Sequence, residues 1–261
     1  MNQFQTISAV VLASLLVFSS LSNAAPQAVA TEQTDQAATQ LPKALTPEVQ
    51  TAKWAEKWWR PRHEEKLKEK AGMTQVDLLF VGDSITHGWE RAGKATFDKY
   101  YAHRNTLNIG FSGDRTENVI WRLQNGAIDG IKPKVAVIMI GTNNTGHRQD
   151  KPEDTAAGVQ AIIDEIQSKT PETKILLLAI FPRGENADDK LRKINDSANA
   201  ILKTKAQDGL VWYLDISEKF LQADGSLPKS IMPDRLHPNA KGYEIWAEAM
   251  EKPIAKLMGE K

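Results

Sequence analysis

Five short apolar runs between residues 76 and 216 alternate with stretches that mix apolar and charged residues. Apolar residues that follow one another without alternation are typical of strands buried on both faces of a parallel sheet. The predicted strands are Val76–Val81, Thr106–Phe111, Val135–Ile140, Lys174–Ile180 and Val211–Ile216. Helical patterns occupy roughly Phe97–Ala102, Glu117–Leu123, Asp154–Ser168, Asp188–Ala206 and Asn239–Met258.

This alternation of strand and helix predicts an α/β fold, a three-layer α/β/α sandwich whose middle layer is a parallel sheet of five strands. We expect the strand order 2-1-3-4-5, in which the second and third strands flank the first. Ligands of such sheets bind beyond the carboxyl ends of the strands, where the strand order reverses. The residues that follow each strand are therefore the first place to look for chemistry.

The N-terminal segment has the pattern of a secretory signal peptide. Residues 1–24 carry no charge, and a mostly apolar run is followed by the small-residue pattern Ser22-Asn23-Ala24. We therefore expect cleavage after Ala24 and a secreted or periplasmic location. The first residues lack the usual basic side chain, so a retained membrane anchor is the alternative.

Residues 25–47 are rich in Ala, Gln, Thr and Pro and lack aromatic residues, which is typical of a flexible linker. The folded domain is expected to occupy residues 48–261 and to begin with a helical segment that Pro61 breaks or kinks. Trp54, Trp58 and Trp59 lie in this segment. They fit either a platform for sugar or lipid or packing on the domain, which we favour because aromatic stripes mostly bury area.

Composition excludes several classes of function. The 33 basic and 33 acidic residues give a net charge of zero, which leaves no basic excess for binding nucleic acid. The absence of cysteine excludes a disulfide scaffold, a zinc ribbon, an iron–sulfur site and a cysteine nucleophile. We expect no cofactor and, in the mature chain, no membrane span.

Three strand ends carry residues that suit nucleophilic catalysis. Ser84 follows the first strand at a strand-to-helix junction, where helix amides favour a developing negative charge. Gly110 ends the second strand, and Asn143 follows the third. In the expected order these strand ends are adjacent, about 4.8 Å apart per strand. We therefore expect Ser84 to be a nucleophile, and the amides of Ser84 and Gly110 and the Asn143 side chain to form an oxyanion hole.

A serine nucleophile needs a base, and the loop from Ser217 to Pro238 contains a candidate. The loop ends in Asp234-Arg235-Leu236-His237 and can cross the distance of roughly 14 Å between the fifth and first strands. His237 is the candidate base for the Ser84 proton. Asp234 is the candidate partner of the other ring nitrogen.

Several neighbouring residues leave alternatives open. Ser112, on a glycine-rich turn, is a second candidate nucleophile, and His87 is a second candidate base on the helix of Ser84. Asp114 and Arg115 either bind substrate or cap the next helix, and we favour the cap because Asp is common at helix starts. The segment Arg183-Gly184-Glu185 could rim a pocket, and nothing in the sequence decides its role.

Together, four blocks of sequence resemble the SGNH/GDSL hydrolase family over roughly residues 76–250. Stretches such as FVGDSITHGW and MIGTNN look most like the branch around the platelet-activating-factor acetylhydrolase catalytic subunits. The resemblance implies a flavodoxin-like sheet, a triad of Ser84, His237 and Asp234, and no metal. It also implies an oxyanion hole of Ser84, Gly110 and Asn143. The four blocks are Gly82-Asp83-Ser84, Gly110, Gly141-Thr142-Asn143 and Asp234-Arg235-Leu236-His237.

By this resemblance the chain is a serine esterase that removes small acyl groups, notably acetyl, through an acyl-enzyme. Together with the leader, it predicts an exported esterase that acts on an acetylated carbohydrate or a platelet-activating-factor-like lipid. The resemblance determines the reaction better than the alcohol, and it leaves a monomer and a homodimer open. The alternative is a catalytically inactive flavodoxin-like module that binds carbohydrate, since fold alone does not confer function.

Overall fold

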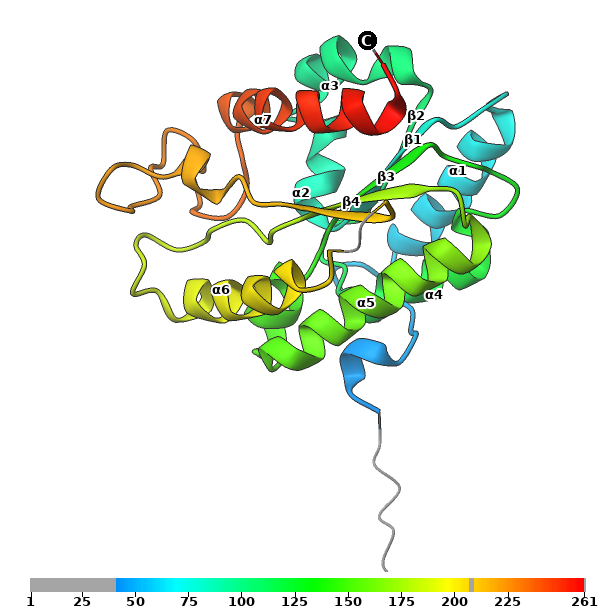
Figure 1. Cartoon of the computed structure of the whole chain (residues 1–261). Coiled ribbons are helices and arrows are strands. Elements are labelled where there is room, and N and C mark those ends of the chain that lie inside the picture. Colours follow the sequence, from blue (N-terminus) through cyan, green and yellow to red (C-terminus); the bar gives the residue numbers. More distant parts are fainter. Residues whose placement is uncertain (1–40, 207–208, 261) are drawn as a thin grey trace, which may run out of the picture. The chain divides into compact units, whose positions relative to one another are not determined.

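A parallel sheet of five strands forms the centre of the protein (Figure 1). The computed structural model describes residues 41–206 and 209–260. The strand order is β2-β1-β3-β4-β5, and all neighbouring strands are parallel, so the predicted order is confirmed. The strands are β1 (Leu78–Gly82), β2 (Thr106–Gly110), β3 (Val135–Met139), β4 (Lys174–Leu178) and β5 (Val211–Leu214).

Helices and short helical turns connect the strands. The α-helices of the described residues are α1 (Trp59–Gly72), α2 (Ser84–His87), α3 (Lys94–Tyr100), α4 (Thr116–Arg122), α5 (Pro152–Lys169), α6 (Lys190–Lys203) and α7 (Ala240–Met258). The shorter turns are η1 (Lys43–Leu45), η2 (Gly88–Glu90), η3 (Ala102–Arg104), η4 (Leu123–Ala127), η5 (Asn144–Arg148) and η6 (Ser217–Phe220).

The helices bury both faces of the sheet, which confirms the three-layer arrangement (Figure 1). Successive side chains of a strand point to opposite faces. Leu79 and Val81 of β1 therefore pack in the apolar cluster that includes residues of α4, α5 and α6. Leu78 and Phe80 pack in the cluster that includes α7 and the aromatic residues near α3. Because both faces are covered, β1 and β3 are apolar along their whole length, whereas β2 includes the buried Asn108, whose side chain is hydrogen-bonded.

Helix α1 begins later than the sequence pattern predicts. Residues 48–58 form extended segments and turns, and the helix starts at Trp59. Pro61 therefore lies in the first helical turn, where its missing N–H costs no hydrogen bond, so the predicted break at this residue is wrong. Trp59 is buried beside Phe111, with ring centroids 5.8 Å apart, as the packing interpretation requires. Trp54 is instead exposed.

The packed domain also starts earlier than the expected boundary at Glu48. Ala44, in the turn η1, is buried, and its carbonyl accepts a hydrogen bond of 2.8 Å from the Thr116 hydroxyl. The end of the expected 25–47 linker therefore packs on the domain. The expected signal peptide, residues 1–24, lies outside the described residues. Within the described part of the chain, no helix is both long enough and apolar enough to span a membrane.

Candidate active site

Ser84, His237 and Asp234 are hydrogen-bonded in a row. Ser84 Oγ lies 2.8 Å from Nε2 of His237, and Nδ1 of His237 lies 2.6 Å from Oδ2 of Asp234. Because an ionised carboxylate only accepts hydrogen bonds, Nδ1 carries the ring proton and donates it to Asp234. Nε2 is then free to accept the proton of the Ser84 hydroxyl. Catalysis by a serine nucleophile requires this arrangement, in which a base contacts the nucleophile and a third group orients the base.

Strand β1 leads directly into the short helix α2 and so places Ser84 at the carboxyl end of the sheet's strands. A Cβ on Gly82 would lie 2.1 Å from Oγ1 of Thr86, so this tight passage requires glycine. Asp83 caps α2 by accepting a hydrogen bond of 2.9 Å from the amide of Ile85. Ser84 follows as the first helical residue, and its amide lies at the positive end of the helix dipole.

The loop that carries His237, residues 217–238, is held in place by the segment after β4. The carbonyl of Arg235 accepts a hydrogen bond of 2.9 Å from the amide of Gly184. The guanidinium of Arg235 donates a hydrogen bond of 2.9 Å to the Glu185 carboxylate. Arg235 itself has a left-handed φ of 60°, which turns the chain sharply just before His237. Gly184 and Glu185 therefore support the loop, and no residue of the segment Arg183-Gly184-Glu185 lines the cavity described below.

Hydrogen bonds keep the Asp234 carboxylate ionised. Its Oδ1 accepts the amides of Leu236 at 3.0 Å and His237 at 2.7 Å, in addition to the ring bond at Oδ2. Burial acts to raise the pKa of Asp234, but the hydrogen bonds and the nearby His237 outweigh it and lower this pKa below its ordinary value. A charged Asp234 can hold the His237 ring in one orientation and would stabilise a protonated ring.

Gly110 does not present its amide to the site, contrary to the expectation from sequence. The amide donates a hydrogen bond of 2.8 Å to the side chain of Asn108, and the carbonyl accepts from Arg62. A Cβ on Gly110 would lie 2.4 Å from the amide nitrogen of His87, so this glycine allows α2 to pack closely on β2. The assignment of Gly110 to the oxyanion hole is therefore wrong, because its donor already has an internal partner.

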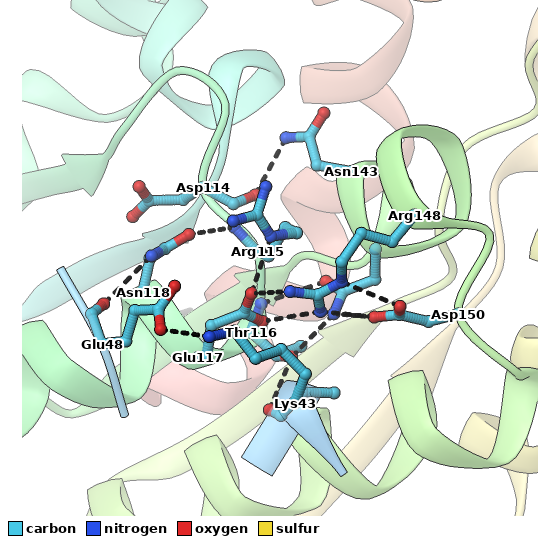
Figure 2. A network of polar contacts seen from close by, with 12 residues as sticks. Lys43, Glu48, Asp114, Arg115, Thr116, Glu117, Asn118, Asn143, Arg148 and Asp150 are labelled. Atoms are coloured by element: carbon cyan, nitrogen blue, oxygen red, sulfur yellow. Dashed lines mark hydrogen bonds and ion pairs between the residues drawn. The ribbon is translucent and has the colours of Figure 1, made fainter. Parts of the chain in front are cut away.

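Gly113 lines the cavity where Gly110 was expected. Its φ of 76° favours glycine, and its amide donates to no acceptor among the described residues. The side chain of Asn143 also lines the cavity, and its Nδ2 donates a hydrogen bond of 2.9 Å to the carbonyl of Asp114 (Figure 2). This bond orients the carboxamide and leaves its second N–H for a ligand. The glycine-rich turn after β2 was the available sequence signal for Gly113.

A second serine–histidine pair lies beside the first. Nδ1 of His87 lies 3.0 Å from Oγ of Ser112 and accepts the Ser112 amide at 3.3 Å. Burial, together with the charge of the nearby Arg62, lowers the pKa of His87 to about 4, so the ring is neutral at neutral pH. His87 is therefore hydrogen-bonded to Ser112, and it makes no hydrogen bond to Ser84.

A buried polar network supports the turn that carries Gly113. Asp114 forms an ion pair of 2.8 Å with Arg122, and neither side chain is exposed to solvent. The Trp59 indole donates a further hydrogen bond of 2.6 Å to Asp114. Arg115 forms an ion pair of 2.7 Å with the buried Glu117 (Figure 2). Neither Asp114 nor Arg115 lines the cavity, which favours a structural role for both. Arg115 is the N-cap residue of α4, but the Asp114 carboxylate caps none of the described helices, because Arg122 and Trp59 occupy it.

A cavity of about 500 Å³ opens above these groups. Ser84, Gly113, Asn143 and His237 all line it, although 153 residues separate the serine from the histidine. These residues follow β1, β2, β3 and β5, so only the folded sheet brings them together. A cavity of this size suits a small ligand.

Comparison with known proteins identifies the family to which the chain belongs. The sequence profile of the GDSL-like lipase/acylhydrolase family matches residues 80–245. The platelet-activating factor acetylhydrolase IB subunit alpha2 of Rattus norvegicus is 35% identical over 187 residues, which cover 71% of this chain and 79% of the relative.

Solved structures support the same fold. A GDSL-like lipase from Bacteroides thetaiotaomicron is similar with a TM-score of 0.60 and 20% identity, covering 74% of this chain and 97% of the other. An acetylxylan esterase from Geobacillus stearothermophilus is similar with a TM-score of 0.55 and 21% identity, covering 72% of this chain and 97% of the other. The sequence match and the shared fold lead to one conclusion: the chain belongs to the GDSL-like lipase/acylhydrolase family and is a carboxylic ester hydrolase.

Proposed function

We propose that the protein is a serine esterase that hydrolyses small acyl esters, acetyl esters above all, through Ser84, His237 and Asp234. The observation that carries this proposal is the contact of 2.8 Å between Ser84 Oγ and His237 Nε2, with Asp234 on the opposite ring nitrogen. Membership of an acylhydrolase family supports the same chemistry.

The reaction begins with attack of Ser84 Oγ on the ester carbonyl carbon, while Nε2 of His237 takes the hydroxyl proton. The negative charge that develops on the carbonyl oxygen meets the amides of Ser84 and Gly113 and the free N–H of Asn143. His237 then returns the proton to the leaving alkoxide, which departs as the alcohol. Water, activated by the same ring, hydrolyses the acyl-enzyme and restores Ser84.

The substrate class rests on what the relatives are named for. Among them are a platelet-activating factor acetylhydrolase subunit and an acetylxylan esterase, so both bear names of enzymes that remove acetyl groups. The cavity of about 500 Å³ is compatible with a small acyl group. The proposed substrates are therefore the acetyl esters of a carbohydrate or of a platelet-activating-factor-like lipid.

Release of acetate from ethyl acetate tests the reaction. The wild-type protein should hydrolyse this ester, and Ser84→Ala should abolish turnover without a loss of folded structure by circular dichroism. Asn143→Ala should lower kcat by about 10²–10³ and leave KM nearly unchanged, since an oxyanion donor acts mainly in the transition state. Turnover that survives Ser84→Ala would refute the proposed nucleophile, and an unchanged kcat in Asn143→Ala would remove Asn143 from the oxyanion hole.

Export completes the proposal. The charge-free N-terminal segment supports secretion or transfer to the periplasm, with cleavage after Ala24. Mass spectrometry of the protein recovered from its native compartment would identify the mature N-terminus. Sedimentation equilibrium of the purified protein would distinguish a homodimer from a monomer.

A further inference from the structure

We propose that Trp54 is a stacking platform for a sugar ring in the alcohol part of the ester, so that the preferred substrate is an acetylated carbohydrate. This inference rests on the proposed esterase function and names its substrate class. Trp54 lines the same cavity as Ser84, and 53% of its surface is exposed. An exposed tryptophan next to a nucleophile offers a large apolar face that the fold itself does not bury.

Contacts with the fold hold the Trp54 indole in position. The ring lies so close to Gly113 that a Cβ on this glycine would be 1.9 Å from Cη2 of the indole. Trp58 stacks against Trp54, with ring centroids 6.1 Å apart and an angle of 29° between the planes, and its own indole N–H donates to the Trp54 carbonyl at 3.0 Å. The platform is therefore preorganised, which lowers the entropic cost of binding.

Ser112 supplies a polar contact beside the platform. His87 Nδ1 accepts the amide of Ser112, so that nitrogen carries no proton and also accepts the Ser112 hydroxyl proton at 3.0 Å. The lone pairs of Ser112 Oγ are thereby left for a donor in the cavity that Ser112 lines. The cavity therefore requires an apolar face for the indole and a hydrogen-bond donor for Ser112. A sugar has both, since its C–H face can lie on the indole while its hydroxyl groups donate to Ser112.

Surface chemistry disfavours a lipid with a long alkyl chain. Among the described residues the exposed large apolar side chains are Leu41, Trp54 and Leu210, and only Trp54 lines the cavity. Apart from Ala92, Leu236 and Pro238, which line the cavity itself, the described residues offer no second strongly exposed large apolar side chain there to cover an alkyl chain, whose burial would drive binding.

Charge disfavours a choline head group on the same indole. Arg91 lines the cavity and pairs with no carboxylate of the described residues, and no Asp or Glu within them lines the cavity. A quaternary ammonium over the indole face would meet this positive charge, whereas the phosphate of a phosphocholine would be attracted to it, so charge acts against the choline group alone. A neutral polyol has no such cost.

Kinetics of the full chain on two acetyl esters tests the platform. The substrates are methyl 2-O-acetyl-β-D-xylopyranoside and ethyl acetate, which has no ring to stack. Trp54→Ala should raise KM for the acetylated xyloside about 10-fold, equivalent to about 1.4 kcal/mol, with kcat within about 2-fold. On ethyl acetate kcat/KM should stay within about 2-fold of wild type. Trp54→Phe should restore most of the loss, and Leu210→Ala, an exposed apolar residue away from the cavity, should resemble wild type.

Equal losses on both esters would overturn the inference, because they would show a structural role of Trp54. An unchanged KM for the xyloside would overturn it as well. A preference of the wild-type protein for a long-chain alkyl acetyl glycerophosphocholine over the xyloside would also overturn the inference. In each of these cases ethyl acetate hydrolysis remains dependent on Ser84, so the esterase proposal survives. Turnover of ethyl acetate that persists in Ser84→Ala instead refutes the esterase proposal itself.

Discussion

At the scale of single residues, the site depends on which polar groups remain without an internal partner. Gly110 ends β2 and Gly113 lies three residues later in the following turn, yet the Gly110 amide is bonded to Asn108 and the Gly113 amide has no acceptor among the described residues. Two histidines differ in the same way, since His87 is buried against Ser112 and His237 reaches Ser84. Residue type alone distinguishes neither pair.

Gly113→Ala is expected to lower kcat on ethyl acetate by at least about 10², because the added Cβ displaces a proposed oxyanion donor. The matched control is Gly130→Ala. Gly130 has a similar φ of 78°, and a Cβ there would meet nothing within 4 Å. This control should lose about 1–2 kcal/mol of stability and keep wild-type kcat. Steady-state kinetics and urea unfolding measure both effects, and a wild-type kcat in Gly113→Ala would exclude its amide from the oxyanion hole.

At the scale of elements, the junction of β1 and α2 combines the proposed nucleophile, Ser84, with a buried helix cap, Asp83. Asp83 has no solvent exposure, and its Oδ2 has no hydrogen-bond partner among the described residues. Burial, with a contribution from the nearby Asp114, raises the pKa of Asp83 to about 7. The folded protein thus keeps a proton on Asp83 at pH values where the unfolded chain has lost it.

Asp83 should therefore make the folded state less stable as pH rises. Between about pH 4 and pH 7 the unfolded state binds fewer protons at this residue than the folded state, so its contribution to the free energy of unfolding falls with pH. Above about pH 7 this contribution becomes constant. Asp83→Asn cannot titrate and should show a shallower decline in urea midpoints over this range.

The control for this comparison is Asp98→Asn, since Asp98 is an exposed carboxylate on α3 that pairs with Lys94. It should keep the wild-type dependence of stability on pH. Identical slopes for wild type and Asp83→Asn would show that Asp83 does not hold a proton in the folded state.

At the scale of the whole molecule, one buried ion pair joins distant parts of the domain. Asp114 follows β2, Arg122 ends α4, and Trp59 begins α1, and all three meet without exposure to solvent. Arg122 also donates to the carbonyl of Ile109 at 3.0 Å and lies 4.0 Å from the centroid of the Phe111 ring. Burial raises the pKa of Asp114 to about 6 against the opposing charge of Arg122.

Arg122→Leu should lower the free energy of unfolding by about 3–5 kcal/mol, because it leaves the Asp114 carboxyl buried without a counter-charge. Urea unfolding at pH 7 measures this loss. Lys94→Leu breaks an exposed ion pair, whose side chains are 59% and 50% exposed, and should cost at most about 1 kcal/mol. Similar losses in the two variants would show that the buried pair contributes no more than a surface pair.

Local patterns in the sequence determined the α/β class and the five strands, since a strand buried on both faces is mostly apolar, and the expected strand order agreed with the sheet that the family resemblance implied. They also determined that Ser84, Asn143 and His237 follow strands at one edge of the sheet. The roles assigned to these side chains remain proposals.

Only the tertiary structure decided which amides and side chains the folded chain leaves available to a ligand. It gave the amide of Gly110 an internal acceptor and left that of Gly113 without one among the described residues, covered Trp59 and exposed Trp54, and packed Ala44 onto the domain. The physical reason is that hydrogen-bond partners and burial depend on contacts between residues far apart in the chain. Periodicity and composition report only the preferences of neighbours in the sequence.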